Sequence, residues 1–201
     1  MSCAAALSLL LLIDTSGSFK DEDWKAMRDG HANALVSEQV RGAITGMPGG
    51  VQLSVMFFSA DTQVALPWTH IQTETQLRRF AYQLAGLSQY AAGATFLDTA
   101  MQDALAHLEA APCEAERQVI DVATDAHSIP VGQLPSLVQE AGAQLVTINA
   151  LGYVTGAPPQ QMQEWLLENV VTPDGFVIVV DAARDFTRAL RRKFVLEITA
   201  R

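Results

Sequence analysis

Oxygen-bearing side chains directly follow an apolar run near the start of the chain. In the segment LLLLIDTSGSF, Asp14, Ser16 and Ser18 occupy alternate positions after the isoleucine. A tight loop can aim side chains with this spacing at one point, and Gly17 allows the backbone to turn there. One carboxylate and two hydroxyls are hard oxygen ligands of the kind that Mg²⁺ prefers. Taken alone, the segment is equally typical of a turn or of a helix N-cap, with the Ser18 hydroxyl capping the next helix.

Further oxygen donors occur at two later points of the chain. Thr95 stands in the small-residue sequence GAT before a predicted helix, and Thr124 and Asp125 close the apolar sequence VIDVATD. In open parallel sheets, ligands bind beyond the carboxyl ends of the strands. Asp121 lies inside the segment VIDVATD and is instead expected to form a hydrogen bond across the core. The strand-end donors contain no histidine or thiol, which favours a hard divalent cation.

The elements that position these residues are predicted to alternate between strands and helices. Strands are expected at residues 6–14, 51–59, 63–71, 117–125, 143–151 and 175–181, from their short apolar runs bounded by turn residues. Helices are expected at residues 18–44, 74–87, 96–111, 131–142, 158–171 and 183–198, from their apolar spacing. Pro67 fits only an edge strand or the end of a strand. The order predicts a three-layer α/β fold, in which helices cover both faces of a doubly wound, mostly parallel sheet with one antiparallel edge strand.

Composition and charge narrow the classes of function. The chain has 201 residues, an apolar fraction of 49% and a formal net charge of −9, and no linker-like segment divides it, so residues 1–201 are expected to form a single domain. The surplus of acidic groups argues against nucleic-acid binding. No apolar run reaches the roughly 20 residues of a membrane span. The basic residues near the C-terminus are expected on the solvated face of the last helix; they are Arg188, Arg191, Arg192 and Lys193.

The segments LLLLIDTSGS, GAT and VIDVATD, in this order, resemble a von Willebrand factor type A domain that carries a metal-ion-dependent adhesion site. The segments LPWTHI, RQVIDVATD and FTRALRRKF further resemble an uncharacterised bacterial subgroup of secreted proteins of this family. The resemblance implies one divalent ion, Mg²⁺ with Mn²⁺ or Ca²⁺ as alternatives, and a free coordination position for an Asp or Glu of a partner protein. The implied ligands are Asp14, Ser16, Ser18, Thr95 and Asp125. The implied rim consists of Thr15, Gly17, Gly93, Ala126 and His127.

The two cysteines lie at similar distances before the two aspartates. Cys3 precedes Asp14 by eleven residues, and Cys113 precedes Asp125 by twelve. Because the adhesion-domain topology implies that the two strands are neighbours, we hypothesise a Cys3–Cys113 disulfide. The alternative is a pair of reduced, buried thiols. A disulfide favours a periplasmic or secreted protein, whereas free cysteines favour the cytoplasm. The segment MSCAAALSLLLLI lacks the basic start of a signal peptide and is interpreted as mature structure.

Three functions are compatible with this pattern. The leading hypothesis is a non-enzymatic module that binds a partner protein through its metal ion. The second is a metal-dependent hydrolase or phosphatase with Asp14 as nucleophile, although Ser16 stands where such enzymes usually carry a second aspartate. The third is a structural scaffold that uses the fold without a metal. The pattern does not indicate an oligomeric state.

Overall fold

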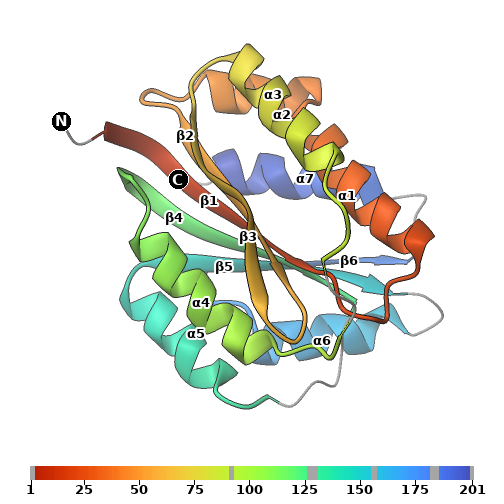
Figure 1. Cartoon of the computed structure of the whole chain (residues 1–201). Coiled ribbons are helices and arrows are strands. Elements are labelled where there is room, and N and C mark those ends of the chain that lie inside the picture. Colours follow the sequence, from red (N-terminus) through yellow and green to blue (C-terminus); the bar gives the residue numbers. More distant parts are fainter. Residues whose placement is uncertain (1–2, 91–92, 126–130, 155–157, 182–185, 200–201) are drawn as a thin grey trace.

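The computed structural model describes residues 3–90, 93–125, 131–154, 158–181 and 186–199. Within these ranges, one sheet contains six strands in the order β3-β2-β1-β4-β5-β6 (Figure 1). The strands are β1 (Cys3–Asp14), β2 (Val51–Phe58), β3 (Thr62–Ile71), β4 (Cys113–Thr124), β5 (Val146–Val154) and β6 (Val177–Asp181). Only the pairing of β3 with β2 is antiparallel. This arrangement confirms the predicted sheet and its antiparallel edge strand.

Helices cover both faces of the sheet, as Figure 1 shows. They are α1 (Asp21–Leu35), α2 (Glu38–Thr45), α3 (Glu74–Ala85), α4 (Leu97–Glu109), α5 (Leu134–Ala143), α6 (Pro159–Asn169) and α7 (Phe186–Thr199). Helices α1, α2, α3 and α7 pack on one face, and α4, α5 and α6 pack on the other. The single helix expected at 18–44 is wrong, because the helix is interrupted at Val36 and Ser37, where the Ser37 hydroxyl donates to the Ala34 carbonyl.

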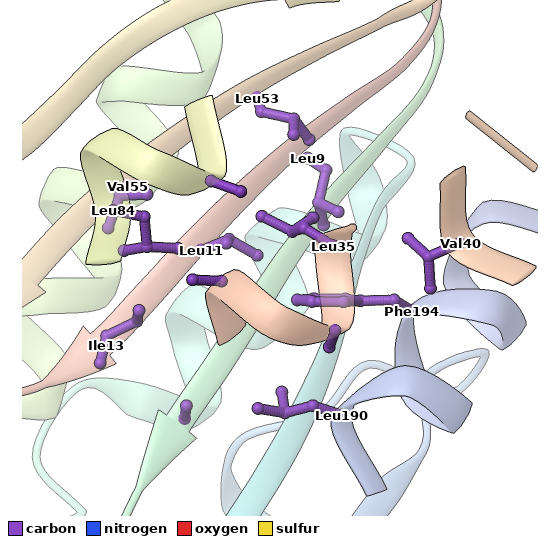
Figure 2. Close-up of a cluster of buried hydrophobic side chains, with 14 of the residues drawn as sticks. Leu9, Leu11, Ile13, Leu35, Val40, Leu53, Val55, Leu84, Leu190 and Phe194 are labelled. Atoms are coloured by element: carbon purple, nitrogen blue, oxygen red, sulfur yellow. The ribbon is translucent and has the colours of Figure 1, made fainter. Parts of the chain in front are cut away.

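The central strand β1 is buried on both faces. Leu9, Leu11 and Ile13 contribute to the core under α1, α3 and α7, whereas Leu10 and Leu12 contribute to the opposite core under α4 and α5. Figure 2 shows the first of these cores, in which the leucines of β1 meet side chains from the covering helices. A strand covered on both sides has no polar face, which explains the uninterrupted apolar run in the sequence.

The last helix differs from expectation at Lys193. This residue was predicted on a solvated face, but its side chain is completely buried. Its ammonium group forms ion pairs with Asp121 of β4 and with Glu197 one turn further along α7. The Asn149 side-chain amide of β5 also donates to Glu197, at 3.0 Å. The prediction failed because a buried carboxylate on the sheet requires a cation from the helix that covers it.

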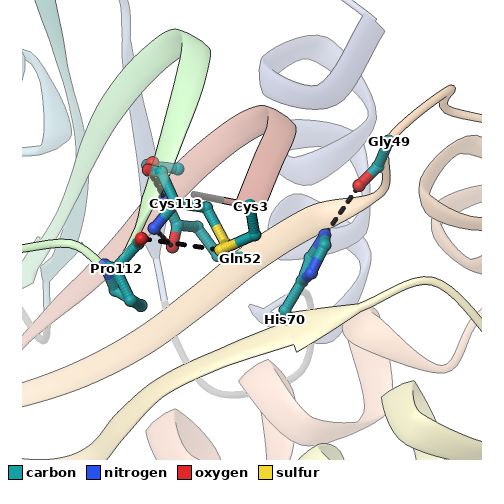
Figure 3. Close-up of a disulfide and its surroundings, with 7 residues drawn as sticks. Cys3, Gly49, Gln52, His70, Pro112 and Cys113 are labelled. Atoms are coloured by element: carbon teal, nitrogen blue, oxygen red, sulfur yellow. Dashed lines mark hydrogen bonds between the residues drawn. A yellow bond between two sulfur atoms is a disulfide. The ribbon is translucent and has the colours of Figure 1, made fainter. Parts of the chain in front are cut away.

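The expected Cys3–Cys113 disulfide is present in the structure (Figure 3). Cys3 and Cys113 are partners in the parallel register of β1 and β4, and their Cα atoms are 4.6 Å apart. The bridge therefore joins the starts of the two central strands. Among the described residues, no helix combines the length and the apolar character needed to cross a bilayer.

Candidate metal centre

The candidate ligands lie at the carboxyl ends of the two central strands. Asp14 is the last residue of β1, and Asp125 directly follows Thr124 at the end of β4. These strands are adjacent, and the chain leaves them toward different sides of the sheet, because β2 lies beside β1 and β5 lies beside β4. Such a switch in strand order opens a crevice at the carboxyl edge, where ligands of open α/β sheets bind.

Hydrogen bonds join four of the five predicted ligands into one cluster. Asp14 accepts from the Ser16 backbone amide at 2.8 Å through one carboxylate oxygen and from the Thr124 hydroxyl at 2.6 Å through the other. The Ser18 hydroxyl donates to Asp125 Oδ1 at 2.8 Å, and the hydroxyls of Ser16 and Ser18 lie 3.1 Å apart. Asp14 and Thr124 are 110 residues apart in the sequence, yet their side-chain oxygens are in direct contact.

The alternative role of Ser18 as a helix cap is wrong. The N-cap position of α1 is Lys20, and no side chain caps that helix end. The Ser18 hydroxyl is instead directed across the sheet edge to Asp125. Thr15, one of the predicted rim residues, turns its hydroxyl away from the cluster and donates to the Phe58 carbonyl of β2 at 3.1 Å. This bond anchors the Asp14 loop to the neighbouring strand.

The segment that contains Thr95 is attached to the Asp14 loop. The Gly17 backbone amide donates to the Gly93 carbonyl at 3.0 Å, which joins two predicted rim residues. The Gln89 side-chain amide donates to the Thr15 carbonyl at 3.2 Å from the other end of the same segment. Thr95 is half-buried and lies two residues beyond Gly93, before α4. The backbone thus brings the fifth predicted ligand to the same edge of the sheet.

A further hydroxyl lies at this edge on Ser59, directly after β2. Ser59 Oγ is buried and has no hydrogen-bond partner among the described residues. Gly93 passes so close that a Cβ atom at its position would be 2.9 Å from this oxygen. Only a residue without a side chain fits there without displacement. The edge therefore contains an unsatisfied oxygen donor, as expected of a site that receives a polar ligand.

The electrostatics of the cluster favour a bound cation. Burial raises the pKa of Asp14, although hydrogen bonds from Thr124 and Ser16 oppose the shift. Burial also raises the pKa of Asp125 to about 6, and the negative charges of Asp14 and Asp23 add to this effect against the hydrogen bond from Ser18. Two carboxylates are thus desolvated side by side. A hard divalent cation would neutralise them, and the carboxylate and hydroxyl donors fit such an ion.

Sequence reasoning missed several residues of this site. Thr124 was recognised at a strand end but not as the hydrogen-bond donor to Asp14. Asp23 was not predicted to belong to the site, yet its charge acts on Asp125, and it accepts from the Tyr153 hydroxyl at 2.7 Å. No sequence signal identified Gln89 or Ser59. The predicted rim residues Ala126 and His127 lie outside the described residues.

The fold is similar to that of solved von Willebrand factor type A domains. One is proximal thread matrix protein 1 from the mussel byssus, described with a zinc-occupied MIDAS (metal-ion-dependent adhesion site) motif. It matches with a TM-score of 0.73 and 16% identity, and the match covers 98% of this chain and 48% of that chain. A von Willebrand factor type A protein from Catenulispora acidiphila matches with a TM-score of 0.66 and 16% identity, over 96% of this chain and 43% of that chain. The vWF domain of the pilus tip protein Mfa5 from Porphyromonas gingivalis matches with a TM-score of 0.63 and 10% identity, over 94% of each chain.

This chain spans about half the length of the mussel protein. At these identities, the likeness establishes the von Willebrand factor type A fold. A search of curated proteins finds no match. The family model described as "Protein of unknown function (DUF1194)" matches residues 3–201. The chain therefore belongs to the DUF1194 family.

Proposed function

We propose that this protein is a non-enzymatic module that binds a partner protein through a divalent metal ion. The observation that carries the proposal is the hydrogen-bonded cluster of Asp14, Ser16, Ser18 and Asp125 at the carboxyl edge of β1 and β4. The similarity to a mussel protein described with a zinc-occupied MIDAS motif supports the same use of the fold.

The proposed ligands are Asp14, Ser16, Ser18, Thr95 and Asp125, some of them acting through water. Mg²⁺ is the preferred ion, with Mn²⁺ and Ca²⁺ as alternatives, because the donors are all hard oxygens. Three of the five side chains are neutral hydroxyls, which donate less electron density than carboxylates do, so the ion stays electrophilic toward a further ligand. A bound ion would therefore attract an Asp or Glu carboxylate of the partner to a free coordination position.

The disulfide supports a place outside the cytoplasm. Disulfides persist in oxidising compartments and are rare where thiols are kept reduced. The Cys3–Cys113 bridge therefore favours the periplasm or secretion. A partner protein presenting an acidic side chain at the cell surface or in the periplasm is compatible with this location.

Titration calorimetry with Mg²⁺ and Mn²⁺ tests the metal site. Asp14→Ala should weaken metal binding by more than about a hundredfold. Replacing a residue that only hydrogen-bonds to a metal ligand already weakens binding by about 10–100-fold. Asp103→Ala removes an exposed carboxylate of α4 and serves as the matched control, which should bind as the wild type does. Circular dichroism verifies that both variants are folded. Unchanged affinity in Asp14→Ala would reject the assignment.

Affinity capture tests the protein-binding role. The wild-type chain, the Asp14→Ala variant and the Asp103→Ala control serve as baits, and each capture is eluted with EDTA. The proposal requires proteins that EDTA releases from the wild type and the control but that the Asp14→Ala bait does not retain. Turnover of a generic phosphoester that is lost in Asp14→Asn would favour the hydrolase alternative. A wild type that binds no divalent ion would favour the metal-free scaffold.

A further inference from the structure

A second cluster of metal-binding residue types lies at the amino edge of the sheet, opposite the candidate metal centre. One ligand atom each of Cys3, His70 and Cys113 lies within 4.8 Å of the others. The cysteines form a disulfide in this structure, and a disulfide has no thiolate to offer a metal. We propose that reduction of this disulfide by a dithiol creates a zinc site made of two thiolates and the His70 imidazole.

The backbone holds the two cysteines together independently of the disulfide. Cys3 and Cys113 are register partners, and the parallel pairing continues with Ala5 and Ala115. The side chain of Gln52 on β2 also holds Cys113, because its amide donates to the Cys113 carbonyl at 2.7 Å and its oxygen accepts from the Cys113 backbone amide at 3.2 Å. The two sulfur atoms therefore remain neighbours after reduction.

The imidazole of His70 lies beside the sulfurs, with its ligand atom within 4.8 Å of both. His70 on β3 is the register partner of Gln52 on β2, and directly paired residues project to the same face of a sheet. Figure 3 shows the imidazole between the disulfide and the Gly49 carbonyl. Cys3 and His70 are partly exposed, so a metal ion can reach them from solvent.

A hydrogen bond prepares the imidazole for a metal. His70 Nε2 lies 2.6 Å from the Gly49 carbonyl oxygen. Because a carbonyl oxygen only accepts, Nε2 carries the proton and Nδ1 retains its lone pair. Histidines that bind metals commonly donate their other ring N–H to a carbonyl or carboxylate in this way. The structure thus fixes the tautomer that a zinc ligand requires.

The chemistry balances with a dithiol as reductant. The two sulfurs of the reductant become joined in a disulfide, and the protein receives two electrons and two protons as two thiols. Zn²⁺ then displaces both thiol protons and binds two thiolates and one imidazole, leaving a fourth tetrahedral position to water. Zn–S bonds of about 2.3 Å require the two sulfurs to separate to about 3.8 Å. The oxidised protein has no such site, so zinc binding at this edge depends on the redox state.

Cobalt spectroscopy of the full chain provides the test. The protein is reduced with dithiothreitol, freed of reductant without oxygen, and titrated with Co²⁺. The reduced wild type should show thiolate-to-cobalt charge-transfer absorption that saturates at one equivalent, and the oxidised wild type should show none. The same absorption should persist in Asp14→Ala, which separates this site from the oxygen-ligand site. His70→Ala should weaken Co²⁺ binding by at least about tenfold.

His107→Ala is the matched control. The imidazole of His107, on α4, contacts the Ser54 hydroxyl of β2 and does not belong to the cysteine cluster. It should leave the cobalt absorption unchanged. The proposal is overturned if the reduced wild type has two titratable thiols but no charge-transfer absorption, or if circular dichroism shows that reduction unfolds the chain. It is equally overturned if His70→Ala and His107→Ala bind Co²⁺ as tightly as each other.

Discussion

Glu197 is expected to retain its proton at neutral pH, because it shares one buried cation with another carboxylate. The Lys193 ammonium pairs with both Asp121 and Glu197, and all three side chains are almost completely removed from water. One positive charge cannot neutralise two carboxylates. Burial, and next the negative charge of Asp121, raise the pKa of Glu197 to about 8 against the opposing effects of Lys193 and Asn149.

This shift makes the folded state less stable as the pH rises. The pKa of Glu197 is about 8 in the folded chain and has an ordinary value of 4.5 when exposed, so the folded state binds the proton more tightly. The free energy of unfolding then decreases between these two pH values by up to about 1.4 kcal/mol per pH unit. Over the full interval from pH 4.5 to about pH 8, the free energy of unfolding would decrease by about 5 kcal/mol. We expect roughly 2–4 kcal/mol, because water entry and local rearrangement relieve part of the cost of a buried charge.

Glu197→Gln should remove this pH dependence. Glutamine has the shape of the protonated acid, and its carbonyl oxygen can accept from Lys193 and Asn149 as Glu197 Oε1 does. Its amide nitrogen would take the position of Oε2, which has no partner among the described residues. The variant should match the wild type near pH 5 and exceed its unfolding free energy by roughly 2–4 kcal/mol at pH 9.

Urea denaturation followed by circular dichroism measures this difference between pH 5 and pH 9. EDTA is present throughout to exclude metal effects, and the titration of Asp125 cancels when variant and wild type are compared at each pH. Glu140→Gln, at an exposed position of α5, is the control and should show no difference that changes with pH. A Glu197→Gln variant that loses stability in parallel with the wild type up to pH 9 would refute the reasoning.

Further predictions concern the disulfide and two glycines. Changing both Cys3 and Cys113 to serine should lower the urea midpoint and cost up to about 5 kcal/mol, because the bridge closes a loop across a sequence separation of 110; an unchanged midpoint would contradict this. Gly30→Ala should destabilise by about 1–3 kcal/mol, since its Cβ would lie 2.5 Å from the Phe186 ring. Gly42→Ala, with open space in α2, should stabilise by about 0.5–1 kcal/mol in the same thermal or urea melts.

The sequence alone predicts that Asp14 and Asp125 lie near each other, because parallel strands end at a common edge. The apolar runs before Asp14 and Asp125 identify two doubly covered strands, and their polar ends must then emerge together. Hydrogen-bond partners are a different matter. Ser18 fits an N-cap and a metal ligand equally well by type and spacing, and only the adjacency of β1 and β4 directs its hydroxyl to Asp125.

The buried charge cluster shows where local patterns become insufficient. The sequence RRKF near the C-terminus is typical of a solvated helix face, and nothing local to it identifies a buried lysine. The relevant signals lie apart, in the carboxylate of Asp121 within an apolar strand and in the i,i+4 spacing of Lys193 and Glu197. Each has an ordinary explanation alone. Their combination becomes specific only when α7 is known to cover β4 and β5.

The pairing of β1 with β4 determines both ends of the molecule. Each strand has 12 residues, and the same register joins Cys3 to Cys113 at one edge and brings Asp14 beside Thr124 at the other. Hard oxygen donors therefore gather at the carboxyl edge, while sulfur and nitrogen donors gather at the amino edge. A slip of one residue would turn the side chains of one strand to the opposite face and separate both groups at once. The disulfide therefore joins one end of the same strand pair whose other end positions the oxygen cluster.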